Sequence, residues 1–221
     1  MKHLLLFAIF TSAPFIGSTL QRSMQQLPEP EPLDYDRVVV PVEQMEEYVS
    51  QQPLCVEPVE EAPALEASDE DINQMLIALI KKYEGFRSTP YRCPAGYLTI
   101  GYGFTDAKYL RMKKLTRAQA DRILEDEMLP KMRQLIARYV KVPLDSCQEA
   151  ALVSFTYNLG EENLERIVSE SRNRLNAGNY KVIPAVMKMY TKAKVNGKPR
   201  TLQGLVTRRN EEAKLFVGDM F

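Results

Sequence analysis

Apolar residues recur at helical spacing over the stretch that begins near residue 68. Ser68 is a favourable N-cap, and the three acidic residues after it suit the first turn of a helix. The pattern stops at Glu84, and Gly85 is a residue type that commonly ends helices. The sequence therefore predicts an amphipathic helix whose buried stripe contains Ile72, Met75, Leu76, Leu79, Ile80 and Tyr83.

The pattern changes between Arg87 and Thr105. Tyrosines and aliphatic residues are interspersed there with glycines and prolines. This composition predicts a small, tightly turned β-hairpin. We expect the rings of Tyr97 and Tyr102 to pack within the hairpin rather than to form platforms for sugars.

Helical patterns dominate the rest of the chain. Thr116 opens a capping box before an amphipathic run that extends to about Tyr139. The next helix is predicted from Asp145 to about Gly160, and it is apolar nearly all round, which is typical of a central buried helix. Three shorter helices are predicted over residues 163–176, 180–191 and 203–216, with Pro184 in the first turn of its helix and a turn at Asn196-Gly197.

The N-terminal third differs from this helical body. Residues 1–20 contain a short basic start, an apolar run and then small residues, which is the order of a signal peptide; the alternative is an uncleaved signal anchor. Residues 21–67 hold seven of the 14 prolines and are rich in Glu and Gln, which predicts a disordered acidic tether. The folded domain is predicted over residues 68–221.

The formal net charge of zero conceals a strong asymmetry. Residues 21–70 carry 13 acidic and two basic residues, whereas residues 71–221 carry 16 acidic and 26 basic residues. A basic body suits an anionic partner such as cell-wall polymer, nucleic acid or anionic membrane, although excess Lys and Arg also serve solubility alone. The opposite charges raise the hypothesis that the acidic tether folds back on the body, or spaces it from a membrane.

Histidine and cysteine are too scarce for several kinds of chemistry. The only histidine is His3, which excludes a Ser-His-acid triad in the body and argues against a zinc site. The three cysteines, Cys55, Cys93 and Cys147, allow at most one disulfide, and the sequence leaves its pairing open.

Glu84 is the strongest candidate for a chemical role. It ends an apolar helix and faces the predicted hairpin rather than open solvent. A carboxyl group that keeps its proton near neutral pH can protonate a glycosidic oxygen. Taken alone, however, a glutamate at a helix end is usually a solvated surface charge.

Several motifs follow one another along the body. Residues 84–87 read E-G-F-R and residues 94–103 read PAGYLTIGYG, while the predicted central helix contains ALVSF and YNLG. Residues 175–180 read LNAGNY, and residues 204–212 read GLVTRRNEE. This ordered set covers essentially all of residues 68–221 and resembles the phage-type lysozyme, or endolysin, family of glycoside hydrolases, which degrade peptidoglycan.

The resemblance implies a catalytic trio. Glu84 matches the family's general acid and Thr99 its threonine, while Cys93 occupies the position of its aspartate. In an inverting mechanism the second group activates a water on the far face of the sugar. A thiol can position that water, and a thiolate can act as base or nucleophile, or Cys93 only fills space while Glu84 and Thr99 suffice. Hydrolysis with either stereochemistry and intramolecular transglycosylation therefore stay open.

Three further residues fall near positions that contact sugars in the family. These are Thr105, Tyr157 and Ser171, with Ser169 as a competitor of Ser171. For Tyr157, packing as a core aromatic at a helix end is an equal alternative.

Two positions near the acid also follow from the resemblance. Phe104 stands where many relatives have a histidine that braces the acid, so its effect is expected on local stability more than on chemistry. Arg208 or Arg209 is expected to pair with Glu84 across the cleft, as an arginine of the last helices does in relatives.

Together these observations predict an α+β, lysozyme-like fold that is mostly helical, with a small β-hairpin lobe and a cleft between two lobes. The expected activity is that of an exported muramidase, periplasmic or secreted, that cuts between N-acetylmuramic acid and N-acetylglucosamine. We expect a monomer that binds bacterial peptidoglycan and not nucleic acid, with a membrane tether if the leader is uncleaved, and with no metal or other cofactor. The alternatives are a lytic transglycosylase that uses Glu84 alone, a catalytically weakened wall-binding protein and, less favoured, a basic nucleic-acid-binding domain.

Overall fold

The computed structural model describes residues 67–92, 97–169, 174–195 and 198–220, together with Gln44 and Glu47. The expected leader and nearly all of the expected tether lie outside these residues. All described residues belong to one compact unit of the chain. Within the part of the chain that the structure describes, every helix is too short or too polar to cross a bilayer.

The first long helix, α2 (Asp69–Glu84), begins and ends where the sequence predicts. The Ser68 side chain accepts a hydrogen bond from the Asp71 N–H at 3.2 Å, and the Asp71 carboxylate accepts one from the Ser68 N–H at 3.2 Å. This reciprocal capping box satisfies two of the free N–H groups at the helix start. Gly85 ends the helix with φ of 63°, in a region that L-residues with side chains rarely adopt. The helix therefore places Glu84 at its last position.

An antiparallel hairpin follows, formed by β1 (Arg87–Arg92) and β2 (Leu98–Gly101). After β2 the chain turns so tightly that Phe104 exchanges two backbone hydrogen bonds with Ile100, at 2.8 and 3.0 Å. A Cβ atom at Gly101 would lie 2.5 Å from the Phe104 ring, so this turn requires glycine.

The aromatic residues of this region do not behave alike. Tyr102 and Phe104 are buried, and the Phe104 ring packs against both Tyr102 and Tyr109. The expectation for Tyr102 is therefore confirmed. The expectation for Tyr97 is wrong, because its side chain is 65% exposed.

The predicted helix from residue 117 to 139 exists but contains a π-helical turn. Its capping box between Thr116 and Gln119 is present. The Leu129 N–H bonds the Leu124 carbonyl, five residues back, immediately before Pro130. Because proline has no N–H and its ring clashes with the carbonyl four residues earlier, a wider turn accommodates it. The run comprises α4 (Arg117–Ile123), the π turn η1 (Leu124–Met128) and α5 (Leu129–Tyr139), preceded by the short α3 (Ala107–Leu110).

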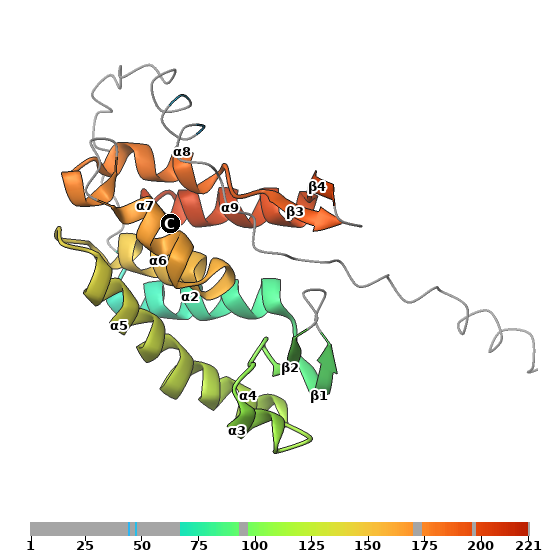
Figure 1. The fold of residues 1–221 in the computed structure, drawn as a ribbon. Helices are drawn as coiled ribbons and strands as arrows, with labels where there is room; N and C mark the ends of the chain where they lie inside the picture. The colour runs from blue at the N-terminus through green and yellow to red at the C-terminus, as the bar shows by residue number, and fades with distance from the viewer. Residues whose placement is uncertain are drawn as a thin grey trace, which may run out of the picture. The chain divides into compact units, whose positions relative to one another are not determined.

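The helix α6 (Ser146–Leu159) is the central helix, as predicted. Its residues 150–156 are all buried, because it packs against both α2 and α9 (Gln203–Phe216) (Figure 1). The capping residue Asp145 and the terminating Gly160, with φ of 81°, confirm both predicted ends.

The shorter helices agree with the sequence only in part. The helix predicted over residues 163–176 is α7 (Glu161–Val168), which ends earlier and is followed by the 3₁₀ turn η2 (Leu175–Ala177). The helix predicted over 180–191 is shorter, because it consists of the 3₁₀ turn η3 (Tyr180–Val182) and α8 (Ile183–Met187). Pro184 lies in the first turn of α8, as predicted.

A second antiparallel hairpin, β3 (Lys192–Val195) with β4 (Lys198–Thr201), was not predicted. Only a turn was predicted at Asn196-Gly197, although that dipeptide between two short segments is a common hairpin signal. Lys192, Lys198 and Arg200 are exposed on this ribbon. The hairpin leads directly into α9, which contributes to the site described next.

Candidate active site

Glu84 lies where α2 ends and the β-hairpin begins. Its side chain is 19% exposed, so it is accessible but largely surrounded by protein. One carboxylate oxygen, Oε2, lies beside the turn after β2, only 3.4 Å from where a Cβ atom at Gly103 would stand. Gly103 has φ of 84°. The glycine therefore permits the positive φ of this turn, and the carboxylate lies directly beside it.

The other oxygen of Glu84 binds an arginine from α9. Arg208 Nη1 donates to Glu84 Oε1 at 2.6 Å, across 124 residues of sequence. The guanidinium is buried and also lies over the Tyr83 ring, 5.3 Å from its centroid. Of the two arginines expected to approach Glu84, Arg208 makes the contact, whereas Arg209 binds Asn158 and Glu212 instead.

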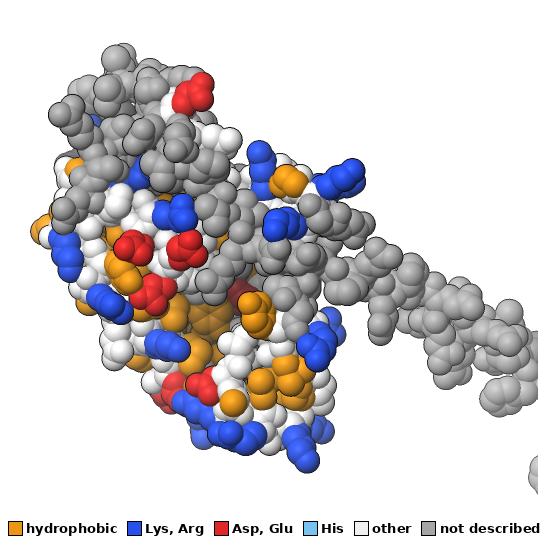
Figure 2. Space-filling view, viewed as in Figure 1, with side chains coloured by type: hydrophobic (Ala, Val, Ile, Leu, Met, Phe, Trp, Pro, Cys, Tyr) orange, Lys and Arg blue, Asp and Glu red, His pale blue; other side chains and the backbone are white. Residues whose placement is uncertain are grey.

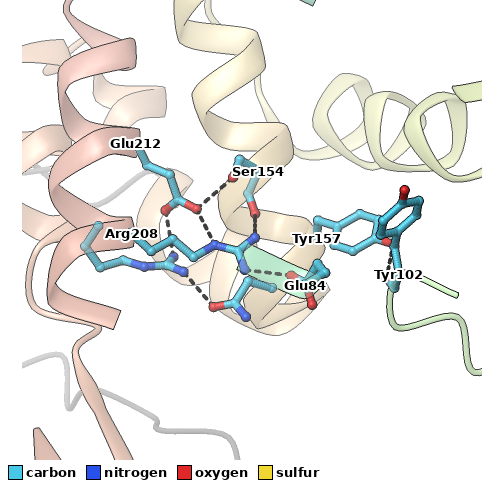
Figure 3. A network of polar contacts seen from close by, with 8 residues as sticks. Glu84, Tyr102, Ser154, Tyr157, Arg208 and Glu212 are labelled. Atoms are coloured by element: carbon cyan, nitrogen blue, oxygen red, sulfur yellow. Dashed lines mark hydrogen bonds and ion pairs between the residues drawn. The ribbon is translucent and has the colours of Figure 1, made fainter. Parts of the chain in front are cut away.

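A buried polar network holds Arg208 in place (Figure 3). Its Nε donates to Glu212 Oε1 at 2.9 Å, and its Nη2 donates to the Ser154 carbonyl at 3.2 Å. The Ser154 hydroxyl in turn donates to Glu212 Oε1 at 2.8 Å. Burial alone would lower the pKa of Arg208, but the charges of Glu84 and Glu212 hold that pKa above its usual value. Arg208 therefore stays charged at any pH at which the protein is folded.

Tyr157 connects α6 to the hairpin turn. Its hydroxyl donates to the Tyr102 carbonyl at 2.6 Å, one residue before the glycine that faces Glu84. Burial, and then the nearby negative charge of Glu84, raises the pKa of Tyr157 well above its usual value. Tyr157 thus lies close to Glu84, but its hydroxyl proton is engaged with the backbone.

Of the remaining residues predicted for the site, the structure describes Thr99 and Thr105. The Thr99 side chain is buried and donates to the Tyr91 carbonyl at 3.3 Å, within the hairpin. Thr105 is exposed after the turn. Cys93 and Ser171 lie outside the described residues.

Sequence reasoning did not single out Ser154 or Glu212. A signal existed for Glu212, because it follows Arg208 by four residues, the spacing at which helix side chains pair. Ser154 carried no such signal. The sequence pattern does not reveal whether a serine in an apolar helix points toward a polar network or away from it.

Figure 2 shows that the face in this view is hollowed near its middle, where hydrophobic side chains form the floor. Both basic and acidic side chains lie around the hollow.

Known proteins share this fold. Residues 81–212 match the phage lysozyme family. An endolysin of Acyrthosiphon pisum secondary endosymbiont phage 1 is 36% identical over 145 residues, which are 66% of this chain and 97% of that protein. A SAR-endolysin of bacteriophage PS119 is 33% identical over 129 residues, 58% of this chain and 73% of that protein. The solved muramidase domain of SpmX from Asticaccaulis excentricus is 32% identical with a TM-score of 0.57, over 66% of this chain and 97% of that one.

These findings define the fold as α+β and lysozyme-like, mostly helical with small antiparallel strand pairs. The chain belongs to the phage lysozyme family. It is accordingly a glycoside hydrolase, a lysozyme that degrades peptidoglycan.

Proposed function

We propose that the protein is a muramidase that hydrolyses the bond between N-acetylmuramic acid and N-acetylglucosamine, with Glu84 as general acid. The observation that carries this proposal is the setting of the Glu84 carboxyl. One oxygen is fixed by the buried Arg208, and the other lies beside Gly103 at the partly open end of α2. A fixed, accessible carboxyl of this kind can deliver a proton to a glycosidic oxygen.

If the enzyme inverts, a water must attack from the opposite face of the sugar. We assign its positioning to Thr99 and Cys93, on the resemblance of this chain to its family. Thr99 belongs to β2, the strand that leads into the turn beside Glu84, which supports a role close to the acid. Sugar contacts are proposed for Thr105, Tyr157 and Ser171. For Tyr157 the ring, rather than the hydroxyl, would make the contact, because the hydroxyl already binds the backbone.

The substrate implies where the protein acts. Peptidoglycan lies outside the cytoplasmic membrane, so we propose that residues 1–20 direct export to the periplasm or beyond, either as a cleaved signal peptide or as a retained membrane anchor. Endolysins and SAR-endolysins among the relatives support export. We further propose that the protein acts as a monomer and does not bind nucleic acid.

The decisive experiment is digestion of purified peptidoglycan by the full chain and by Glu84→Gln, with products identified by mass. We expect the variant to lose about 10²–10⁴-fold in rate, because a positioned acid contributes about that much. The matched control is Glu162→Gln, an identical change at a half-exposed residue whose partner among the described residues is its helix neighbour Arg166. It should cleave like the unaltered protein.

The products separate the remaining possibilities. Reducing ends that disappear in Glu84→Gln support the hydrolase, whereas anhydro ends would show a lytic transglycosylase. A full chain that sediments with cell walls but releases nothing would overturn the catalytic proposal in favour of wall binding.

A further inference from the structure

Glu212 is a carboxylate buried behind Arg208, away from solvent. Its side chain is 0% exposed, and both of its oxygens contact cationic groups. Oε1 accepts from Arg208 Nε and from the Ser154 hydroxyl, and Oε2 forms an ion pair with Arg209 Nη1 at 2.9 Å. A carboxylate withdrawn from water so completely is costly unless its charge is matched, so its partners define its role.

Arg208 is shared between two carboxylates. The same guanidinium reaches Glu84 Oε1 at 2.6 Å through Nη1 and Glu212 Oε1 at 2.9 Å through Nε. Figure 3 shows Arg208 lying between them. With all four side chains ionised, two arginines face two glutamates, and the network is neutral. Protonation of Glu84 leaves one excess positive charge.

We propose that Glu212 is a positioning residue that divides Arg208 between two carboxylates and thereby sets how readily Glu84 keeps its proton. Without the charge of Glu212, two guanidinium groups would face Glu84 alone, and the ionised form of Glu84 would be favoured. Without Arg209, Glu212 would pair with Arg208 only, the network would carry one negative charge more, and the protonated form would be favoured. This inference rests on the proposed role of Glu84 as the acid.

The other ionisable groups around Glu84 and Glu212 do not change charge in the working range. Burial raises the pKa of Tyr83 above its usual value, with Glu211 and Glu212 adding to the shift, and the pKa of Tyr157 is raised as described. Burial lowers the pKa of Arg209 to about 10, which still leaves it charged at neutral pH. Glu211 forms an ion pair with Lys82 at 2.6 Å. Tyr83, Tyr157 and Arg209 therefore keep their charge state near neutral pH.

The test compares two substitutions in the full chain, one that removes a negative charge from the network and one that removes a positive charge. The rate of peptidoglycan cleavage at low substrate concentration is measured from pH 4 to pH 9 for Glu212→Gln and Arg209→Gln. The alkaline limb of this profile reports loss of the proton from the acid in the free enzyme. We expect the limb to move down by about one pH unit in Glu212→Gln and up by a similar amount in Arg209→Gln.

Opposite shifts distinguish this role from a structural one, because both substitutions disturb the same buried network and would weaken the fold alike. Ser154→Ala is the matched control, since it removes a hydrogen bond from Glu212 without changing any charge, and its limb should not move. If Glu212→Gln does not fold, Glu212→Asp is compared with Arg209→Gln instead. Glu212→Asp keeps the negative charge, so the alkaline limb of its pH profile should coincide with that of the unaltered protein.

Limbs that do not move in the folded variants, or that move in the same direction, would overturn the inference. A Glu84→Gln protein that still cleaves would instead overturn the proposed role of the acid itself, so the two failures are distinguishable.

Discussion

At the scale of single residues, Gly103 shows how backbone geometry and the acid are coupled. Its φ of 84° is open to glycine and strained for other L-residues, and a Cβ atom there would lie in van der Waals contact with Glu84 Oε2, at 3.4 Å. The residue therefore serves both the turn after β2 and the placement of the carboxylate. Two separate costs are expected when a side chain is introduced.

Gly103→Ala should lower the free energy of unfolding by about 1–2 kcal/mol, because an alanine in this region is strained by about that amount. It should also slow cleavage, because relief of this backbone strain would shift the turn beside Glu84 Oε2, which would lie 3.4 Å from the new methyl group. Gly178→Ala is the matched control, since Gly178 has φ of 79° but open space around it. Urea unfolding should show a similar loss in both variants, with slower cleavage only in Gly103→Ala. Unaltered cleavage by Gly103→Ala would contradict the described packing.

At the scale of elements, the hairpin turn is tied to two helices by one carboxylate. Asp121 of α4 accepts from the Tyr102 hydroxyl at 2.8 Å and pairs with Lys81 of α2 at 2.9 Å. Burial alone would raise the pKa of Asp121, but Lys81 and Tyr102 outweigh it and hold that pKa below its usual value. The contact contributes to holding the turn beside the end of α2.

Asp121→Asn should lower the free energy of unfolding by about 1 kcal/mol at pH 7, the typical contribution of such a hydrogen bond. Because the folded pKa lies below the unfolded value near 3.8, the stabilisation is complete above that value. It is lost as the pH falls through the folded pKa. Unfolding followed at pH 7 and pH 3 should thus show a smaller difference between the variant and the unaltered protein at pH 3. The control Asp126→Asn changes an exposed residue of the π turn and should unfold like the unaltered protein at both pH values. An equal loss of stability in Asp121→Asn and Asp126→Asn would refute the role of Asp121.

At the scale of the whole molecule, charge is distributed unevenly along the chain. Residues 21–70 carry 13 acidic and two basic residues, and the body that follows is basic. Exposed Lys192, Lys198 and Arg200 on the β3–β4 hairpin contribute to this positive surface. Attraction between the acidic segment and the basic body would compete with binding of an anionic wall polymer to the body. This attraction would weaken as salt is added.

If the acidic segment masks the body, deletion of residues 21–66 should speed wall digestion several-fold at low salt and leave it unchanged at high salt. The control replaces the glutamates of that segment with glutamine at constant length, which should reproduce the effect if charge is the cause. Digestion with the same rate and the same salt dependence in all three proteins would rule out masking.

The sequence by itself determined the elements whose local signals agree. Ser68, Thr116 and Asp145 cap the starts of their helices. Gly85 and Gly160 end theirs, because capping and turn chemistry act over a few residues. The order of the motifs along the chain indicated the family. The local sequence signals for secondary structure were weaker in short segments whose conformation depends on the elements packed against them. The β3–β4 hairpin is rich in lysine and has little intrinsic strand preference, and α7 ends at Val168 without a residue type that enforces the end.

Only the tertiary structure decided how the site is assembled. The sequence narrowed the partner of Glu84 to two adjacent arginines, and the direction of each side chain on α9 selected Arg208. Arg208 and Glu212 are four residues apart on α9, but both contact Ser154 on α6, more than 50 residues earlier in the chain. Such contacts follow from how α2, α6 and α9 pack together, and periodicity along one chain carries no information about which polar groups meet across that packing.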